Sequence, residues 1–112
     1  MKRGEIWQVN LDPTVGAEIQ KSRPAIILND DSIGILPLKV IIPVTDWKPH
    51  YGAALWMVKL EPDGANNLSK ISAADCFQLR SVSNLRFIRK IGEVKAIKMK
   101  EIEIALKAVL KV

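Results

Sequence analysis

The sequence predicts one small domain made mostly of β-strands, with a single α-helix at its C-terminal end. Short apolar runs separated by turn residues recur through residues 6–91, a pattern typical of an antiparallel sheet. Residues 102–110 instead repeat their apolar side chains at helical spacing. The 112 residues can bury one core and contain no repeat or interdomain linker. We therefore expect residues 1–112 to form a single domain with a barrel-like, mostly antiparallel sheet.

The first two strands are separated by a polar loop. Residues 6–11 predict the first strand, and the turn-forming pair Asp12-Pro13 ends it. Residues 14–22 show no periodicity and are expected to form a loop. The proline of Arg23-Pro24 holds the arginine in an extended conformation. The near-continuous apolar run at residues 25–28 then predicts a strand buried on both faces.

The third expected strand, residues 40–45, contains Pro43. A proline cannot donate a hydrogen bond to a neighbouring strand, so we expect this strand to lie at an edge or to be bulged there. Further strands are expected at residues 55–60, 72–81 and 87–91, and Gly92 is expected to end the last one.

The C-terminal helix is predicted by an apolar stripe formed by Ile102, Ala105, Leu106, Val109 and Leu110. Glutamates stand early in this segment and lysines late, which suits the helix dipole.

The net charge of +5 is concentrated in residues 86–100, where six basic residues face only Glu93. Such a segment can attract nucleic acid, an acidic protein or an anionic membrane, and a solvated face without a partner is an equally open alternative. The apolar runs are too short to cross a bilayer. With the single Cys76 and no leader pattern, this predicts a cytoplasmic protein without a membrane partner.

The residue types exclude several kinds of chemistry. One histidine and one cysteine cannot make a zinc site, and no carboxylate cluster has the spacing of a calcium loop. No glycine-rich nucleotide-binding loop is present. His50, alone in a loop, is more often structural than catalytic. We therefore expect no metal and no cofactor, and any enzyme built on this chain must work without them.

Four elements follow one another near the start of the chain: Arg3-Gly4-Glu5-Ile6-Trp7, Leu11-Asp12-Pro13, Gly16-Ala17-Glu18 and Arg23-Pro24. This constellation resembles the MazF/PemK/Kid family of toxin endoribonucleases, with weaker similarity over residues 40–45 and 72–91. The resemblance implies an SH3-like barrel of the CcdB/PemK type that pairs into a homodimer. It also implies a metal-independent, sequence-selective endoribonuclease that cleaves single-stranded mRNA as the toxin of a toxin–antitoxin module.

RNA can be cleaved without a metal because its own 2′-OH can attack the neighbouring phosphorus. The protein must then take that proton, neutralise charge on the phosphoryl oxygens and protonate the leaving oxygen. Arg23 suits the second task, since its planar fork can bond two phosphate oxygens. The residues alone favour another reading, in which Arg23 pairs with a carboxylate such as Glu18.

The resemblance makes Arg23 the central catalytic residue and matches two more positions. Thr45 corresponds to the family's catalytic Thr or Ser and would hydrogen-bond the phosphate or the 2′-OH, although by itself it is simply a good strand former. Glu18 corresponds to the glutamate of the family's G-x-E motif. It would act as a weak base, orient Arg23 or bind a base edge.

RNA contacts are expected from further residues. Lys21 and Lys48 would follow phosphates and Trp47 would stack on a base, while Gln78 would read a base edge or face water. Phe77 stands where many family members have an acidic residue. Asp75, expected on the same strand face, is the candidate substitute, and its alternative is an edge carboxylate or a partner for Arg80.

The resemblance also implies an antitoxin whose acidic, disordered tail would cover the RNA channel, and contact with DNA only through the toxin–antitoxin complex. An acidic tail could fold onto the basic segment at residues 86–100. Two other function classes stay open. One is a non-enzymatic toxin that poisons DNA gyrase, as CcdB proteins do on the same fold, and the other is a plain nucleic-acid-binding module.

Overall fold

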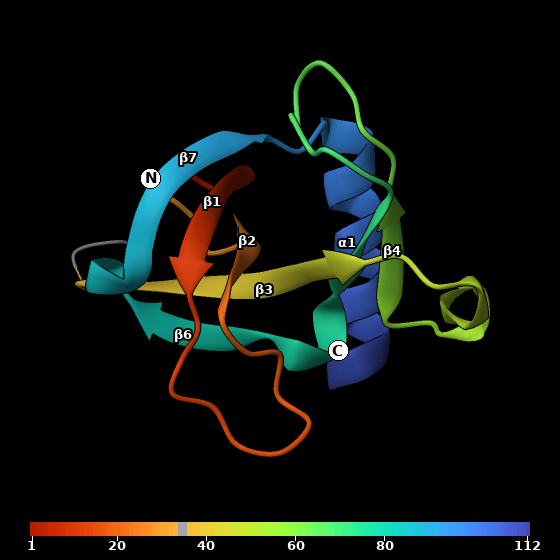
Figure 1. Ribbon diagram of the computed structural model, residues 1–112, viewed down its shortest axis with the longest axis horizontal. Helices are drawn as coiled ribbons and strands as arrows, with labels where there is room; N and C mark the ends of the chain where they lie inside the picture. The colour runs from red at the N-terminus through yellow and green to blue at the C-terminus, as the bar shows by residue number, and fades with distance from the viewer. Residues whose placement is uncertain (34–35) are drawn as a thin grey trace.

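The computed structural model describes residues 1–33 and 36–112, which form a twisted antiparallel sheet with one α-helix packed against it (Figure 1). The strands are β1 (Glu5–Asn10), β2 (Ser22–Ile27), β3 (Leu38–Asp46), β4 (Met57–Leu60), β5 (Ser72–Asp75), β6 (Arg80–Ser83) and β7 (Phe87–Glu93). Three short 3₁₀ segments, η1 (Pro49–Ala53), η2 (Cys76–Gln78) and η3 (Asn84–Arg86), and the helix α1 (Ala96–Leu110) complete the described elements. The prediction of a mostly β fold with a C-terminal helix is confirmed.

The strands follow the order β4-β5-β3-β2-β1-β7, and β6 also pairs with β3. Strands β4 and β7 stand at the two ends of this order, so the sheet curls like a barrel but stays open. Among the residues that the structure describes, no helix has the length and apolar character needed to cross a membrane.

Two apolar cores form because the strands bury alternate residues on opposite faces of the sheet. Ile6, Ile26 and Ile42 pack with Ile102 of α1 in the first core. The second core contains Val9, Leu11, Ala25, Ile27, Ile41 and Val82. Strand β2 therefore contributes to both, as the apolar run at residues 25–28 predicted.

Strand β3 lies inside the sheet, so the edge position expected from Pro43 is wrong. On one side β3 pairs with β2, with Ala25 opposite Pro43. On the other side residues 38–41 pair with β6 and residues 44–46 pair with β5. Pro43 lies at the junction between these two partners, where the ladder is interrupted, and a proline is tolerated at such a point.

The single strand expected at residues 72–81 is also wrong, because η2 divides it into β5 and β6. Asp75 ends β5, and its carboxylate accepts a hydrogen bond from the Phe77 N–H at 3.1 Å. This bond caps the first turn of η2 and redirects the chain.

Gly92 does not end β7, which continues to Glu93. A Cβ atom at Gly92 would stand 2.5 Å from the Ala65 carbonyl oxygen and 2.6 Å from that of Asn66. The glycine thus permits the turn between β4 and β5 to pack directly on β7.

The helix α1 begins at Ala96, earlier than its apolar stripe suggested. Ile102 and Ala105 are buried, as that stripe predicted. Leu110, at the end of the helix, is 52% exposed and lies outside the core.

Candidate active site

Arg23 and Thr45 lie at neighbouring strand ends. The antiparallel pairing of β2 with β3 starts at Ala25 opposite Pro43, and Arg23 and Thr45 each lie two residues beyond this pair. Both side chains line one pocket of 240 Å³, together with Asp46 and Lys70. The structure thus brings together the two residues that were expected to contact the scissile phosphate.

The Arg23 guanidinium is only lightly engaged by the protein. Its Nε donates one long hydrogen bond of 3.3 Å to the Gln20 carbonyl oxygen. Within residues 1–33 and 36–112, no carboxylate oxygen lies within 4.0 Å of it. The pairing of Arg23 with Glu18 is therefore wrong, since Glu18 accepts the Val15 N–H at 3.0 Å instead. Half-buried and charged, Arg23 keeps its fork available for an anion.

Lys70 is a cation of this pocket that sequence reasoning missed. Its Nζ lies 2.9 Å from Asp46 Oδ1, and both side chains are more than half exposed. Such a surface ion pair is weak and screened by salt, so a phosphate could compete for Lys70. No local pattern marks this lysine, because only the pairing of β3 with β5 brings its turn beside Thr45.

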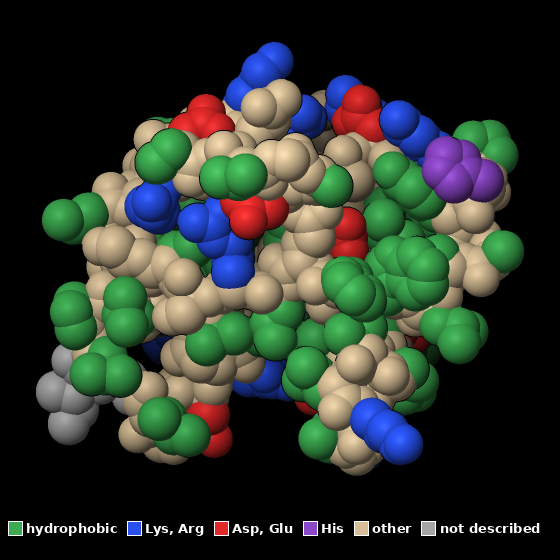
Figure 2. Space-filling view, turned by 90° about the horizontal axis from the view of Figure 1, so that it is seen from below, with side chains coloured by type: hydrophobic (Ala, Val, Ile, Leu, Met, Phe, Trp, Pro, Cys, Tyr) green, Lys and Arg blue, Asp and Glu red, His purple; other side chains and the backbone are tan. Residues whose placement is uncertain are grey.

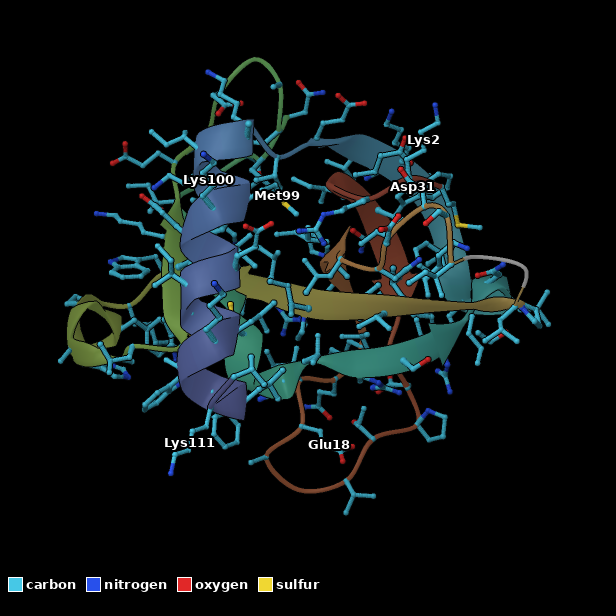
Figure 3. All side chains as sticks on the ribbon, turned by 180° about the vertical axis from the view of Figure 1, so that it is seen from behind. Lys2, Glu18, Asp31, Met99, Lys100 and Lys111 are labelled. Carbon is cyan, nitrogen blue, oxygen red and sulfur yellow. The ribbon has the colours of Figure 1, made fainter. Side chains whose placement is uncertain are left out.

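Glu18 lies in the β1–β2 loop (residues 11–21), at the opposite end of the molecule from Lys2 and Asp31 (Figure 3). It lines a separate cavity of 500 Å³, alongside Gln78 and Arg80. Of the three catalytic candidates, Arg23 and Thr45 thus share a pocket and Glu18 does not.

Lys21 and Gln78 both hold the backbone of this loop. Lys21 has a positive φ of 70°, and its N–H donates to Asp12 Oδ1 at 3.0 Å. Gln78 accepts the Ile19 N–H at 2.6 Å and donates to the Ala17 carbonyl oxygen at 3.1 Å. Both ends of the Gln78 amide are thus engaged, while the Lys21 side chain is exposed.

Trp47 and Lys48 follow β3 directly. The Trp47 ring meets Tyr51 edge-on at 5.9 Å, and Lys59 Nζ stands 5.2 Å from its ring centroid. This cation–π contact orients the indole beside a positive charge, a suitable setting for an unpaired base. Lys48 is exposed.

Asp75 is buried, and it does not share a strand face with Phe77, because η2 starts between them. Nor is it an edge carboxylate or a partner of Arg80, since β5 pairs with both β3 and β4 and Arg80 donates to the Leu11 carbonyl oxygen. Burial raises the pKa of Asp75, although hydrogen bonds from the Phe77 and Gln78 N–H groups act to lower it.

Burial, with the Asp75 charge, also raises the pKa of Cys76 to about 12, so this thiol stays protonated.

The basic segment at residues 86–100 is partly neutralised, since three of its six basic residues form ion pairs. Arg86 donates to the carbonyl oxygens of Asn10 and Asp12. Three of its lysines form ion pairs: Lys90 with Glu5 and Glu93, Lys95 with Asp63, and Lys98 with Glu101. On the face shown in Figure 2, basic, acidic and hydrophobic side chains are interspersed. The folded protein therefore has fewer unpaired cations in residues 86–100 than the sequence suggested.

The open curled sheet places the chain among small, mostly antiparallel β proteins with a C-terminal helix. The family model described as "PemK-like, MazF-like toxin of type II toxin-antitoxin system" matches residues 2–110. The chain belongs to this family. The family resemblance drawn from the first four motifs is thereby confirmed.

Two relatives with known names align over much of the chain. Endoribonuclease MazF9 of Mycobacterium tuberculosis is 31% identical over 96% of this chain and 93% of its own length. Endoribonuclease PemK of Escherichia coli is 35% identical over 73% of this chain and 60% of its own length.

Solved structures share the fold at lower identity. MazF from Deinococcus radiodurans has a TM-score of 0.81 at 23% identity and covers all of this chain and 97% of its own. An endoribonuclease in complex with its cognate antitoxin, from a mycobacterial species, has a TM-score of 0.79 at 16% identity. The two alignments span 100% of this chain, and the second covers 96% of the mycobacterial chain.

Proposed function

We propose that this protein is an endoribonuclease that cleaves single-stranded mRNA without a metal, as the toxin of a toxin–antitoxin pair. The observation that carries the proposal is the Arg23 guanidinium, held at a strand end beside Thr45 with one long hydrogen bond to the protein. An arginine kept this free in a polar pocket is suited to bind a phosphodiester.

In the proposed reaction the RNA supplies its own nucleophile. The 2′-oxygen forms a bond to phosphorus as the bond to the 5′-oxygen breaks, and the leaving 5′-oxygen takes a proton from water, which leaves a 2′,3′-cyclic phosphate and a 5′-OH end. Arg23 binds the phosphoryl oxygens and neutralises the charge that grows on them. Thr45 donates its hydroxyl to the phosphate or holds the 2′-OH. Glu18, carried on the β1–β2 loop, takes the 2′-OH proton when the loop meets RNA.

The RNA would cross the molecule beside these residues. Lys21 and Lys48 are proposed to track phosphates, and Trp47 to stack on a base. Asp75 would contact RNA only by exchanging its present hydrogen bond for one to a nucleobase, while both ends of the Gln78 amide are engaged by the β1–β2 loop.

The partners follow from the family to which the chain belongs. We propose an antitoxin whose acidic segment blocks the RNA site, a homodimer, and DNA contact only within the toxin–antitoxin complex. The cytoplasm, where mRNA lies, is the proposed location.

Incubation of the purified protein with a long single-stranded RNA and excess chelator tests this function. We expect discrete cuts with 2′,3′-cyclic phosphate ends, and none with Arg23→Ala. Intact RNA together with undiminished toxicity of Arg23→Ala in cells would instead support a gyrase-poisoning toxin of the CcdB type. Binding of RNA or DNA without cleavage or toxicity would leave a plain nucleic-acid-binding module.

A further inference from the structure

The β1–β2 loop is closed at its base but thinly supported at its middle. At the base, the Leu11 N–H donates to the Lys21 carbonyl oxygen at 3.0 Å. Further along, Val15 and Glu18 form hydrogen bonds only with each other among the described residues, with the Glu18 N–H donating to the Val15 carbonyl oxygen at 3.3 Å. Ile19 packs against the second core, whereas Ala17 and Glu18 are exposed and line the cavity of 500 Å³ described above, so packing anchors this stretch through Ile19.

Gln78 connects the middle of this loop to the body of the protein. Its side chain reaches from the end of η2 across 59 residues of sequence to Ile19, and across 61 residues to Ala17. The acceptor and the donor of one amide thus meet the N–H of one loop residue and the C=O of the second residue before it. A residue of a neighbouring strand would offer one C=O acceptor and one N–H donor to the loop. The Gln78 side-chain amide offers the same two groups.

The chemistry of this contact requires a primary amide. A carboxylate can accept from the Ile19 N–H but would repel the Ala17 carbonyl oxygen. An apolar side chain would satisfy neither group. Either change leaves the loop without these two bonds to the rest of the sheet.

These bonds lead directly to the candidate active site. Ile19 is followed by Gln20, and the Gln20 carbonyl oxygen accepts the Arg23 Nε–H. Two hydrogen bonds and one peptide link therefore join the Gln78 amide to the Arg23 guanidinium. The same stretch carries Glu18 and Lys21.

We propose that Gln78 is a positioning residue, which holds the β1–β2 loop so that the Arg23 guanidinium stays aligned beside Thr45. The proposal rests on the ribonuclease function proposed above. It differs from the sequence-based expectation for Gln78, because here the amide acts on the loop backbone and not on a base.

Amide hydrogen exchange tests whether Gln78 holds the β1–β2 loop, without any assay of activity. In Gln78→Leu, the Lys21 N–H, which bonds to Asp12 and not to Gln78, is expected to exchange about tenfold faster. Amides in β3 and α1 should keep their rates. The matched control is Gln8→Leu, a half-buried glutamine on β1, which should leave Lys21 unchanged. An unchanged Lys21 rate in Gln78→Leu would overturn the proposal.

Protonation of a carboxyl introduced at position 78 should restore the hydrogen bonds to the loop, which a general loss of structure would not allow. In Gln78→Glu, the introduced carboxyl is charged at pH 7 and should loosen the loop as Gln78→Leu does. Below its ordinary pKa of about 4.3 it regains an O–H donor for the Ala17 carbonyl oxygen. After correction for intrinsic exchange, protection at Lys21 should return at low pH in Gln78→Glu and not in Gln78→Leu. Equal protection of the Lys21 N–H in the two variants at low pH would contradict the proposal that Gln78 holds the loop.

Steady-state cleavage separates positioning from RNA contact. A loosened Arg23 should lower kcat about tenfold with KM nearly unchanged, since the lost alignment acts in the transition state. A higher KM with kcat unchanged would mean that Gln78 binds RNA directly and would overturn the proposal. If the wild-type protein cleaves no RNA, the ribonuclease proposal fails, while the exchange measurements still decide whether Gln78 holds the loop.

Discussion

Arg3 and Arg23 lie at opposite ends of the β1–β2 hairpin, and the protein treats them in opposite ways. Arg3 Nη2 pairs with Glu103 Oε2 at 2.6 Å, and Nη1 donates to the Leu28 carbonyl oxygen. Arg23 has a single long bond to a loop carbonyl. One guanidinium joins the N-terminus to α1, whereas the other is left with its donors available. The fold uses few of the donors of Arg23, the arginine proposed to bind RNA, and most of those of Arg3.

At the end of the hairpin that carries Arg3, the charged side chain of Glu5 also has hydrogen-bond and ion-pair partners within the protein. Buried Glu5 accepts from the Trp7 indole at 2.9 Å and the Lys2 N–H at 3.0 Å, and Lys90 Nζ lies 3.2 Å away. Burial alone would raise the pKa of Glu5, but these donors outweigh it and lower the pKa to about 2. Charges at this end stabilise the fold, whereas those of the Arg23 pocket are open to a ligand.

The largest changes in RNA cleavage and stability are expected when the two arginines are replaced. Arg23→Ala should reduce RNA cleavage about a hundredfold to a thousandfold, because the transition-state charge loses its main partner. Its free energy of unfolding should change by less than about 0.5 kcal/mol. Arg3→Ala should do the reverse, with a loss of about 1–2 kcal/mol and near-normal cleavage by the folded protein. Cleavage rates and urea unfolding of both variants check this, and equal loss of activity in both would break the comparison.

The next effect concerns Glu5 and pH. Its pKa is lowered on folding, so its stabilisation is present above the unfolded value of 4.5 and is lost as the pH falls towards about 2. Glu5→Gln should therefore cost about 2 kcal/mol at pH 7, and the difference from wild type should shrink below pH 4. Denaturant unfolding from pH 7 to pH 3 measures it. A difference independent of pH would mean that the charge of Glu5 is not what stabilises this end.

A smaller effect is expected at Thr45. Thr45→Val keeps the shape and the strand propensity but removes the hydroxyl, so cleavage should fall about tenfold with stability retained. Thr45→Ser keeps the hydroxyl and is the matched control, which should retain most of the activity. Equal activity of the Val and Ser variants would remove Thr45 from the mechanism.

The smallest effect is expected at Asp75. Its pKa is raised by burial, so the charged form is disfavoured in the folded state. Asp75→Asn keeps an acceptor for the Phe77 N–H and removes a buried charge, so stability at pH 7 should change by less than about 0.5 kcal/mol or rise slightly. Thermal unfolding tests this. A large loss would show that the carboxylate charge itself holds η2.

The sequence predicted the parts of the fold that local pattern controls. Short apolar runs bounded by turn residues located β1, β2 and β7, and helical spacing located α1. The edge position inferred from Pro43 and the single strand at residues 72–81 were wrong, because both depend on the switch of β3 from one partner strand to another, which no local pattern encodes. In the same way Arg23 and Thr45 were identifiable from motifs, whereas Lys70 reaches the pocket only through strand pairing.

The most direct test of the central claim is to observe the two guanidinium groups while RNA binds. Side-chain Nε–H resonances of Arg23 and Arg3 can be followed by NMR during titration with an RNA oligonucleotide whose attacking 2′-OH is replaced by hydrogen, so that it binds without being cut. The account predicts a large shift at Arg23 and none at Arg3. A bound oligonucleotide that leaves the Arg23 resonance unmoved would contradict it.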